Sequence, residues 1–228
     1  MTSTKWIRSM KLRSAARAQR RVLGLLAMTL LGMASPQPPD AAADSGARVV
    51  VQKTIDAVLV VLNDKKATTD QKRSRIEGIA YERFDFPTLS RLVLARNWQR
   101  FSKPQQDEFM VEFKRYLAVN YGNRIERYDN QKVEIVGERK EPRGDVTIQS
   151  VVRGGEFEGA TIDYRMRENS GQWMVIDVIV EGISLVSNFR DQFKEVLANG
   201  GPEQLLQKLK EKNAAGPPPA ETHKAGAS

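Results

Sequence analysis

The residue types that carry most enzyme chemistry are nearly absent from this chain. The sequence has no cysteine, and its single histidine, His223, lies in a tail rich in proline, alanine and glycine. Structural disulfides, thiol catalysis and cysteine–metal sites are therefore excluded. A histidine base or a His-ligated metal in the folded body is almost excluded as well. The sequence contains neither a G-x-S-x-G elbow nor a G-x-x-x-x-G-K-[ST] or G-x-G-x-x-G phosphate-binding loop.

One carboxylate stands out, because Asp177 lies within an apolar run where an ionised side chain needs partners if it is buried. A buried acid with a raised pKa can act in catalysis. Such a group more often accepts hydrogen bonds from an arginine or the backbone, and we favour that structural role. Glu181, at the end of the same run, can cap the helix that follows. We find no convincing carboxylate pair, and we expect no catalytic residue, no metal site and no cofactor.

The positive charge is concentrated at the N-terminus. The formal net charge is +8, from 36 Lys and Arg against 28 Asp and Glu. Seven basic residues precede Ala34 with no acid among them, which leaves 29 basic and 28 acidic residues in the rest of the chain. A nucleic-acid-binding body needs a lasting basic face, so we expect no nucleic-acid partner.

Residues 1–34 show the parts of a signal peptide. A basic stretch precedes the apolar run Val22–Ala34, which is too short to span a bilayer. The small residues Gly32 and Ala34 suit cleavage after Ala34, and residues 40–44 offer an alternative site. We therefore expect export with cleavage, and an uncleaved anchor is the alternative.

A Pro/Ala-rich linker is expected at residues 35–47. No cysteine follows the apolar run, so a lipoprotein anchor is not expected. Export through the Sec route is the default, while the pair Arg20-Arg21 leaves the twin-arginine route open.

The spacing of apolar residues predicts helices in the first part of the chain, then a run of strands, and then further helices. Helices are predicted over Val51–Leu62, around Ile76–Ala80, from Asp85, from Ser102 to near Tyr128, over Ser184–Asn199 and over Pro202–Lys212. Strands are predicted over residues 132–138, 145–153, 158–168 and 172–182, with Gly, Pro and Asn turns between them. This order predicts one α+β domain over residues 48–213, followed by a disordered tail over 214–228.

Two helix starts carry clear local signals. Asp85 fits an N-cap, with Pro87 in the first turn and Phe84 placed to pack on Leu89. Residues 102–105 have the S-x-x-Q pattern of a capping box.

The last strand is apolar on both faces. Strict alternation places Trp173, Val175 and Ile179 with Asp177, and places Met174, Ile176, Val178 and Val180 opposite. Either protein covers both faces, or one face lines a cavity for an apolar ligand, and periodicity leaves both open. Earlier strands give one apolar face, and Asp163, Arg165 and Arg167 are expected to meet water on the other.

Two segments resemble motifs of the MlaC family, the periplasmic phospholipid-shuttle proteins also called the toluene-tolerance family. They are FDFPTLSRLVLARNWQRFSKPQQDEF at residues 84–109 and WMVIDVIVEGISLVSNFRDQF at residues 173–193. The resemblance covers about residues 49–213. Ala95 stands where the family commonly has glycine, and we expect this difference to alter a helix contact slightly.

The resemblance implies helices packed on a curved antiparallel four-stranded sheet that encloses an apolar lipid cavity. It implies a carrier that holds a glycerophospholipid by its acyl chains and performs no chemistry on it. Such proteins move lipid between an outer-membrane lipoprotein–porin complex and an inner-membrane ABC transporter with an MCE-domain protein, which maintains outer-membrane lipid asymmetry. We expect a periplasmic monomer. The alternatives are an exported protein-binding adaptor with a dry core and an α+β enzyme that uses Asp177.

On this basis we expect a lipid-binding wall and a headgroup site. The expected wall residues are Leu89, Val93, Phe113, Leu117, Val133, Ile135, Val146, Ile148, Ile162, Tyr164, Trp173, Val175, Ile183, Val186 and Phe189. The expected headgroup residues are Arg91, Tyr121, Asn188 and Arg190. The segments 83–87 and 180–184 are candidate hinges.

Overall fold

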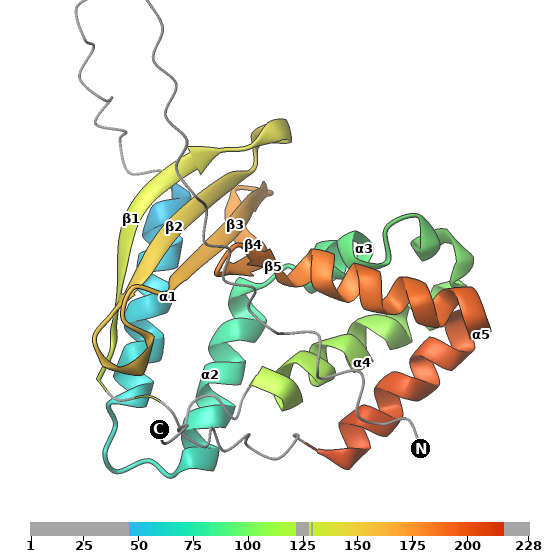
Figure 1. Cartoon of the computed structure of the whole chain (residues 1–228), viewed down its shortest axis with the longest axis horizontal. Coiled ribbons are helices and arrows are strands. Elements are labelled where there is room, and N and C mark those ends of the chain that lie inside the picture. The colour runs from blue at the N-terminus through green and yellow to red at the C-terminus, as the bar shows by residue number, and fades with distance from the viewer. Residues whose placement is uncertain (1–45, 122–127, 129, 217–228) are drawn as a thin grey trace, which may run out of the picture. The chain divides into compact units, whose positions relative to one another are not determined.

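The computed structural model describes residues 46–121, 128 and 130–216 (Figure 1). The expected signal peptide at 1–34 lies outside the described residues, as do most of the linker and the tail from residue 217. The predicted α+β order is confirmed. The helices are α1 (Gly46–Leu62), α2 (Thr69–Arg83), α3 (Phe86–Leu94), the 3-10 helix η1 (Ala95–Arg100), α4 (Lys103–Tyr121) and α5 (Leu185–Ala215), and the strands are β1 (Lys132–Lys140), β2 (Val146–Arg153), β3 (Thr161–Asn169), β4 (Gln172–Val180) and β5 (Ile183–Ser184).

The strands form one antiparallel sheet in the order β1-β2-β3-β4-β5. The four predicted strands are present, and the two-residue strand β5 adds a fifth at the β4 edge. Helix α1 contacts all four long strands, and the sheet curves around it in Figure 1. The short turns between strands explain the antiparallel order, since such turns can connect only antiparallel neighbours.

A first hydrophobic cluster, here called the sheet core, lies between α1 and the sheet. Helix α1 contributes Ala47, Val51 and Ile55, spaced four residues apart along one face. The sheet contributes Val146, Ile148, Met166 and Val175.

A second cluster, the helical core, joins α3, η1, α4 and α5. Four phenylalanine rings form its centre, with Phe113 stacked on Phe109 at 5.4 Å and in edge-to-face contact with Phe189 and Phe193. These rings are at most 3% exposed. Edge-to-face contacts of this kind add to the stabilisation from burial alone.

Local capping signals fix the helix starts as predicted. The Asp85 carboxylate accepts a hydrogen bond from the Thr88 amide at 2.9 Å, so Asp85 caps α3. Ser102 and Gln105 each accept from the other's backbone amide, which completes the predicted capping box of α4. Helix α4 is described to Tyr121, and the rest of its predicted length up to residue 127 lies outside the described residues.

The face assignment predicted for β4 is wrong beyond a β-bulge. Arg165 pairs with Asp177 but Met166 pairs with Val175, so Ile176 is an extra residue in β4. Cross-strand partners share a face, and therefore Val175 lies on the face of Met166 rather than with Asp177. The bulge explains why this strand is apolar at both odd and even positions, since its inward face changes parity at Ile176.

The charged residues Asp163, Arg165 and Arg167 on the opposite sheet face meet water only in part. Asp145 is 2% exposed, and Arg167 donates to both of its oxygens at 2.7 and 2.8 Å. The pKa of Arg167 is raised by this hydrogen bond. Arg165 lies 3.7 Å from the same carboxylate. A buried carboxylate requires such partners, so the two arginines pack over it and are only half-exposed.

The two C-terminal helices predicted from sequence are the two halves of α5. Gly201 has φ 71° and ψ −169° inside α5, and Pro202 follows it. This conformation kinks the helix between the two predicted segments, the first of which ends at Asn199 and the second of which begins at Pro202. Both halves add leucines to the helical core, Leu197 before the kink and Leu205 after it. Helix α5 continues to Ala215, two residues into the segment expected to be disordered.

The effect of Ala95 falls on the backbone rather than on a helix contact. Ala95 follows α3 with φ 48° and ψ −127°, a conformation that glycine adopts freely and a Cβ disfavours. This accounts for the glycine that is common at this position in the resembled family.

We expect Ala95→Gly to stabilise the protein by about 1 kcal/mol, because it relieves this strain. The midpoint of thermal unfolding should rise by about 2–4 °C. The matched control is Ala57→Gly in the middle of α1, which should destabilise by about 0.5–1 kcal/mol. An unchanged or lower midpoint for Ala95→Gly would contradict the strained backbone.

Candidate functional site

The predicted wall residues fall into a buried group and a half-buried group. The buried group belongs to the two cores and consists of Leu89, Val93, Phe113, Val146, Ile148, Val175, Val186 and Phe189. The half-buried group consists of Leu117, Val133, Ile135, Ile162, Tyr164 and Trp173, and Ile183 is 49% exposed. Buried residues already have protein neighbours on every side, so only the half-buried group offers free apolar surface.

Half-buried apolar side chains pack against both cores, and we call this set the apolar border. On the sheet core it comprises Val50, Leu59, Phe84, Val133, Ile135, Tyr164, Trp173 and Val178. On the helical core it comprises Phe84, Leu92, Trp98, Tyr116, Leu117, Tyr121 and Leu185. Phe84 belongs to both lists and is the side chain where the two cores meet.

Tyr164 combines two properties that rarely occur together. Burial raises the pKa of Tyr164 to about 12, so protein atoms surround its phenol closely enough to remove it from bulk water. The side chain is nevertheless only half-buried, and its hydroxyl has no hydrogen-bond partner among the described residues. Tyr164 therefore adds partly exposed apolar surface to the inner face of the sheet. Its cross-strand partners Ile148 and Val178 extend the same surface.

The helical part is attached to β4 at two joints. At the first joint the Asp85 amide donates to the Val175 carbonyl at 3.0 Å, and Phe84 forms a parallel bridge with Val175. At the second joint, β5 pairs with the end of β4 and leads directly into α5. The predicted hinge segments 83–87 and 180–184 contain these two joints.

The surroundings of Asp177 match the structural role that we favoured. Asp177 is 3% exposed. One carboxylate oxygen accepts from the Ser184 hydroxyl at 2.5 Å and the other from the Val186 amide at 3.0 Å. Ser184 in turn caps α5 by accepting from the Ser187 amide. Both oxygens of Asp177 therefore stabilise the N-terminus of α5.

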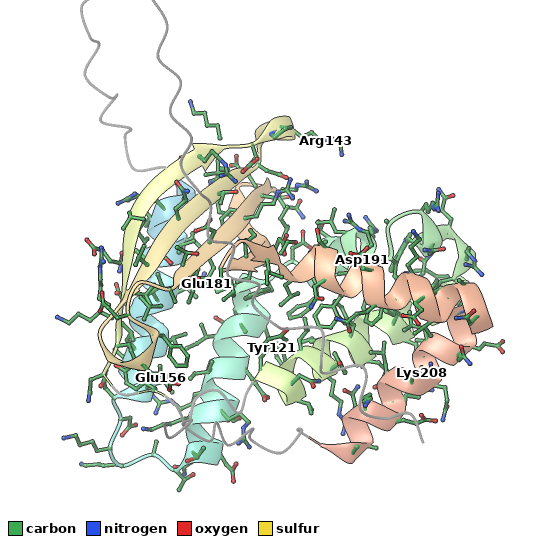
Figure 2. The ribbon with its side chains drawn as sticks, in the orientation of Figure 1. Tyr121, Arg143, Glu156, Glu181, Asp191 and Lys208 are labelled. Carbon is green, nitrogen blue, oxygen red and sulfur yellow. The ribbon has the colours of Figure 1, made fainter. Side chains whose placement is uncertain are left out.

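Glu181 does not cap α5. Its carboxylate accepts from the backbone amide and the hydroxyl of Thr161 at the start of β3. Glu181 has φ 51° and precedes Gly182 in the turn between β4 and β5 (Figure 2). The side chain therefore points back to β3, and Ser184 takes the capping position.

The four expected headgroup residues lie on three helices. Arg190 donates from Nε and Nη2 to the Leu92 carbonyl at 3.0 and 2.8 Å, which ties α5 to the C-terminal end of α3. Arg91 is exposed and lies 5.8 Å from the centre of the Trp98 ring. Asn188 is half-buried on α5, and Tyr121 lies at the end of α4 against the helical core (Figure 2).

Within residues 46–121, 128 and 130–216, no three His, Asp or Glu side chains are grouped to hold a metal ion. None of the described helices has the length and apolar composition needed to cross a bilayer. An open pocket at the α1–α2 turn is lined by Asp64, Lys66, Ala67, Gln71, Ser74 and Arg75.

Among the apolar border residues that are absent from the predicted wall, two lie on β4 or bridge to it. Val178 was assigned to the wrong face because the β4 bulge has no sequence signal. Phe84 was taken only as a helix staple, although its place beside an apolar strand and before an N-cap could have indicated a joint between layers.

Comparisons with known proteins agree with this architecture. A family model described as MlaC protein matches residues 52–211. The toluene tolerance protein ttg2D of Pseudomonas putida is 28% identical over 185 residues, which cover 78% of this chain and 80% of that protein. The intermembrane phospholipid transport system binding protein MlaC of Haemophilus influenzae is 22% identical over 125 residues, which cover 52% of this chain and 58% of that protein.

A solved structure shares the fold. The phospholipid-binding protein from Ralstonia solanacearum, in complex with a phospholipid, matches with a TM-score of 0.67 and 25% identity. The match covers 74% of this chain and 97% of that chain.

We expect Asp177→Ala to destabilise the protein by about 2–3 kcal/mol, because it leaves the Ser184 hydroxyl and the Val186 amide without their charged acceptor. Urea unfolding followed by circular dichroism measures this loss. Asp191→Ala, which removes an exposed carboxylate from α5, should change stability by less than about 0.5 kcal/mol. Equal small effects for both variants would rule out the proposed role of Asp177 at the α5 start.

We expect Tyr164 to ionise late in an alkaline titration. Its folded-state pKa of about 12 lies above the unperturbed value of about 10. The neutral phenol therefore stabilises the fold fully below about pH 10, and this contribution is lost as the pH rises towards 12. The tyrosinate absorbance of the wild type minus that of Tyr164→Phe should show a step near pH 12. A step near pH 10 would show that the phenol meets bulk water, and Tyr128→Phe serves as the control.

Proposed function

Because this chain belongs to the MlaC family, we propose that it is a lipid carrier that holds a phospholipid by its acyl chains against the apolar border. The observation that carries this proposal is the apolar border itself, a set of apolar side chains that pack on both cores and are only half-buried. The phospholipid in the Ralstonia solanacearum structure, which shares the fold, supports the same ligand class.

The energetics favour a carrier with surplus apolar surface. Each methylene group kept from water contributes about 0.8 kcal/mol, so an acyl chain cannot cross an aqueous space without cover. The helical core closes on its own four phenylalanines, and the sheet core closes on α1. The side chains of the apolar border pack against these two clusters but remain partly uncovered. Their exposed apolar surface is available to the acyl chain of a lipid.

We assign direct lipid contact to the half-buried residues and packing support to the buried ones. The contact set is Phe84, Leu117, Val133, Ile135, Ile162, Tyr164, Trp173 and Val178. The buried members of the predicted wall hold these side chains in place. Ile183, at the open end of β5, is assigned to the opening of the site.

The proposed activity is the transfer of an unmodified lipid, without any chemical reaction. Asp177, the strongest catalytic candidate in the sequence, has both oxygens occupied by the start of α5. An adaptor with a dry core would not require the partly uncovered apolar side chains of the border. No bond is made or broken, so delivery requires comparable affinities in donor and acceptor or a driven step at one end.

We further propose that the carrier works in the periplasm, after export by its N-terminal leader. It would exchange lipid with an outer-membrane lipoprotein–porin complex and with an inner-membrane ABC transporter that bears an MCE-domain protein. This exchange would maintain the lipid asymmetry of the outer membrane. Family membership and the signal-peptide pattern of residues 1–34 support the assignment.

The direct test is organic-solvent extraction of the purified protein followed by mass analysis of the extract. We expect about one phospholipid per chain when the full-length protein is exported in a Gram-negative host. Extracts without phospholipid would contradict the carrier and favour the adaptor.

A larger side chain in the lipid-binding site should lower the amount of bound phospholipid without unfolding the protein. Val178→Trp should lower the retained phospholipid by at least about fivefold, since overpacking an apolar site costs about 1–3 kcal/mol. Val136→Trp is the matched control, because Val136 is also a strand valine but is 52% exposed. Equal lipid content in both folded variants would show that Val178 does not face the ligand.

A further inference from the structure

Lys114 in the middle of α4 has an environment that none of the roles above uses. Its ammonium nitrogen lies 3.5 Å from the centre of the Tyr81 ring and 5.2 Å from that of Phe86. Tyr81 lies in the last turn of α2 and Phe86 begins α3, so the amine bridges α4 to the α2–α3 connection. The Tyr81 and Phe86 rings also meet edge to face at 5.8 Å.

This half-buried cation has no anionic partner in the described part of the chain. No carboxylate there lies within ion-pairing distance of Lys114, and nearby acids on α4 are engaged elsewhere. Glu108 pairs with Lys210, and Glu112 accepts from Asn213. Ring faces attract an ammonium group but accept none of its hydrogen bonds in the way an oxyanion does. The amine is therefore fixed in place with donor capacity left for an anion.

Its position lies at the edge of the apolar border. Lys114, Leu117 and Tyr121 follow one stripe of α4, at spacings of three and four residues. Phe86 stacks on Phe84 at 5.9 Å, and Phe84 is the residue shared by both cores. Tyr81 is 37% exposed, so water reaches this end of the stripe. An acyl chain along Leu117 would therefore bring the polar end of its lipid to the amine.

We propose that the Lys114 ammonium group, held by Tyr81 and Phe86, binds the phosphate of the carried lipid. This inference rests on the proposed carrier function and adds a headgroup residue outside the expected set. The ligand chemistry is a phosphate oxyanion attached to an apolar chain. A charge-assisted contact at this place would select phospholipids over neutral lipids with the same tails.

The test compares two lipids that share their acyl chains. Delipidated full-length mature protein is titrated with dioleoyl phosphatidic acid and with dioleoylglycerol, and displacement of a fluorescent fatty-acid probe is measured. Lys114→Met keeps the aliphatic stem over Tyr81 and removes the charge. It should weaken phosphatidic acid binding at least about tenfold and leave dioleoylglycerol binding unchanged. Lys114→Arg should retain most of the affinity, and Arg115→Met, one exposed residue away, is the matched control.

Each other outcome overturns the inference in a distinguishable way. Equal losses for both lipids in Lys114→Met, and in Lys114→Gln as a second variant, would assign Lys114 to packing alone. Unchanged phosphatidic acid binding would remove the headgroup role. Saturable binding of inorganic phosphate that disappears in Lys114→Met would assign the site to free phosphate instead. Wild-type protein that binds neither lipid would overturn the carrier function itself.

Discussion

The structure depends on β4, which both packs in the sheet core and anchors the helical part of the protein. Its Val175 side chain packs in the sheet core while its Val175 carbonyl accepts the Asp85 amide that begins the helical part. Two positions further, the Asp177 side chain fixes the start of α5. The bulge at Ile176 makes this possible, because it lets Val175 face α1 while Asp177 faces α5.

This attachment along a single strand explains why the protein has two cores rather than one. The helical core is closed by its own phenylalanines, and α1 closes the sheet core, so neither needs the other for cover. Side chains where the clusters approach each other are left half-buried. In an ordinary domain such layers interlock into one dry interior. Here each cluster has its own buried residues, and the apolar side chains that pack against the clusters remain partly exposed.

The sequence predicted well those features that are set by residues close together in the chain. The Asp85 cap and the Ser102–Gln105 box are decided within one helical turn, and the strands and turns alternate clearly. The bulge at Ile176 depends on which residues of β3 pair with β4, and no local pattern encodes that pairing. Val178 was placed on the wrong face for this reason. At Ala95 the motif revealed an unusual residue, but only the backbone angles gave the cause.

The site was less predictable than the fold, because periodicity identifies an inward face without showing what lies opposite. Phe113 and Tyr164 both belong to inward stripes, yet Phe113 is fully buried and Tyr164 is only half-buried. Arg190 was a reasonable anion ligand from its motif, and the structure shows its guanidinium on the Leu92 carbonyl. Lys114 had no signal at all, since Tyr81 and Phe86, which define its surroundings, lie about thirty positions earlier in the chain.

Phe84 packs against both hydrophobic clusters, so its motion determines how easily the two clusters can separate. The Phe84 ring contacts residues of both clusters, and its backbone forms the bridge to Val175. Releasing it from one cluster forfeits roughly the burial of a single aromatic side chain, about 1.5–3 kcal/mol. A state that lies higher by this free energy is populated roughly 0.6–7% of the time, which is the range of spontaneous thermal fluctuation. Thermal motion is therefore sufficient to release Phe84 from one cluster, without nucleotide hydrolysis and without unfolding of the protein.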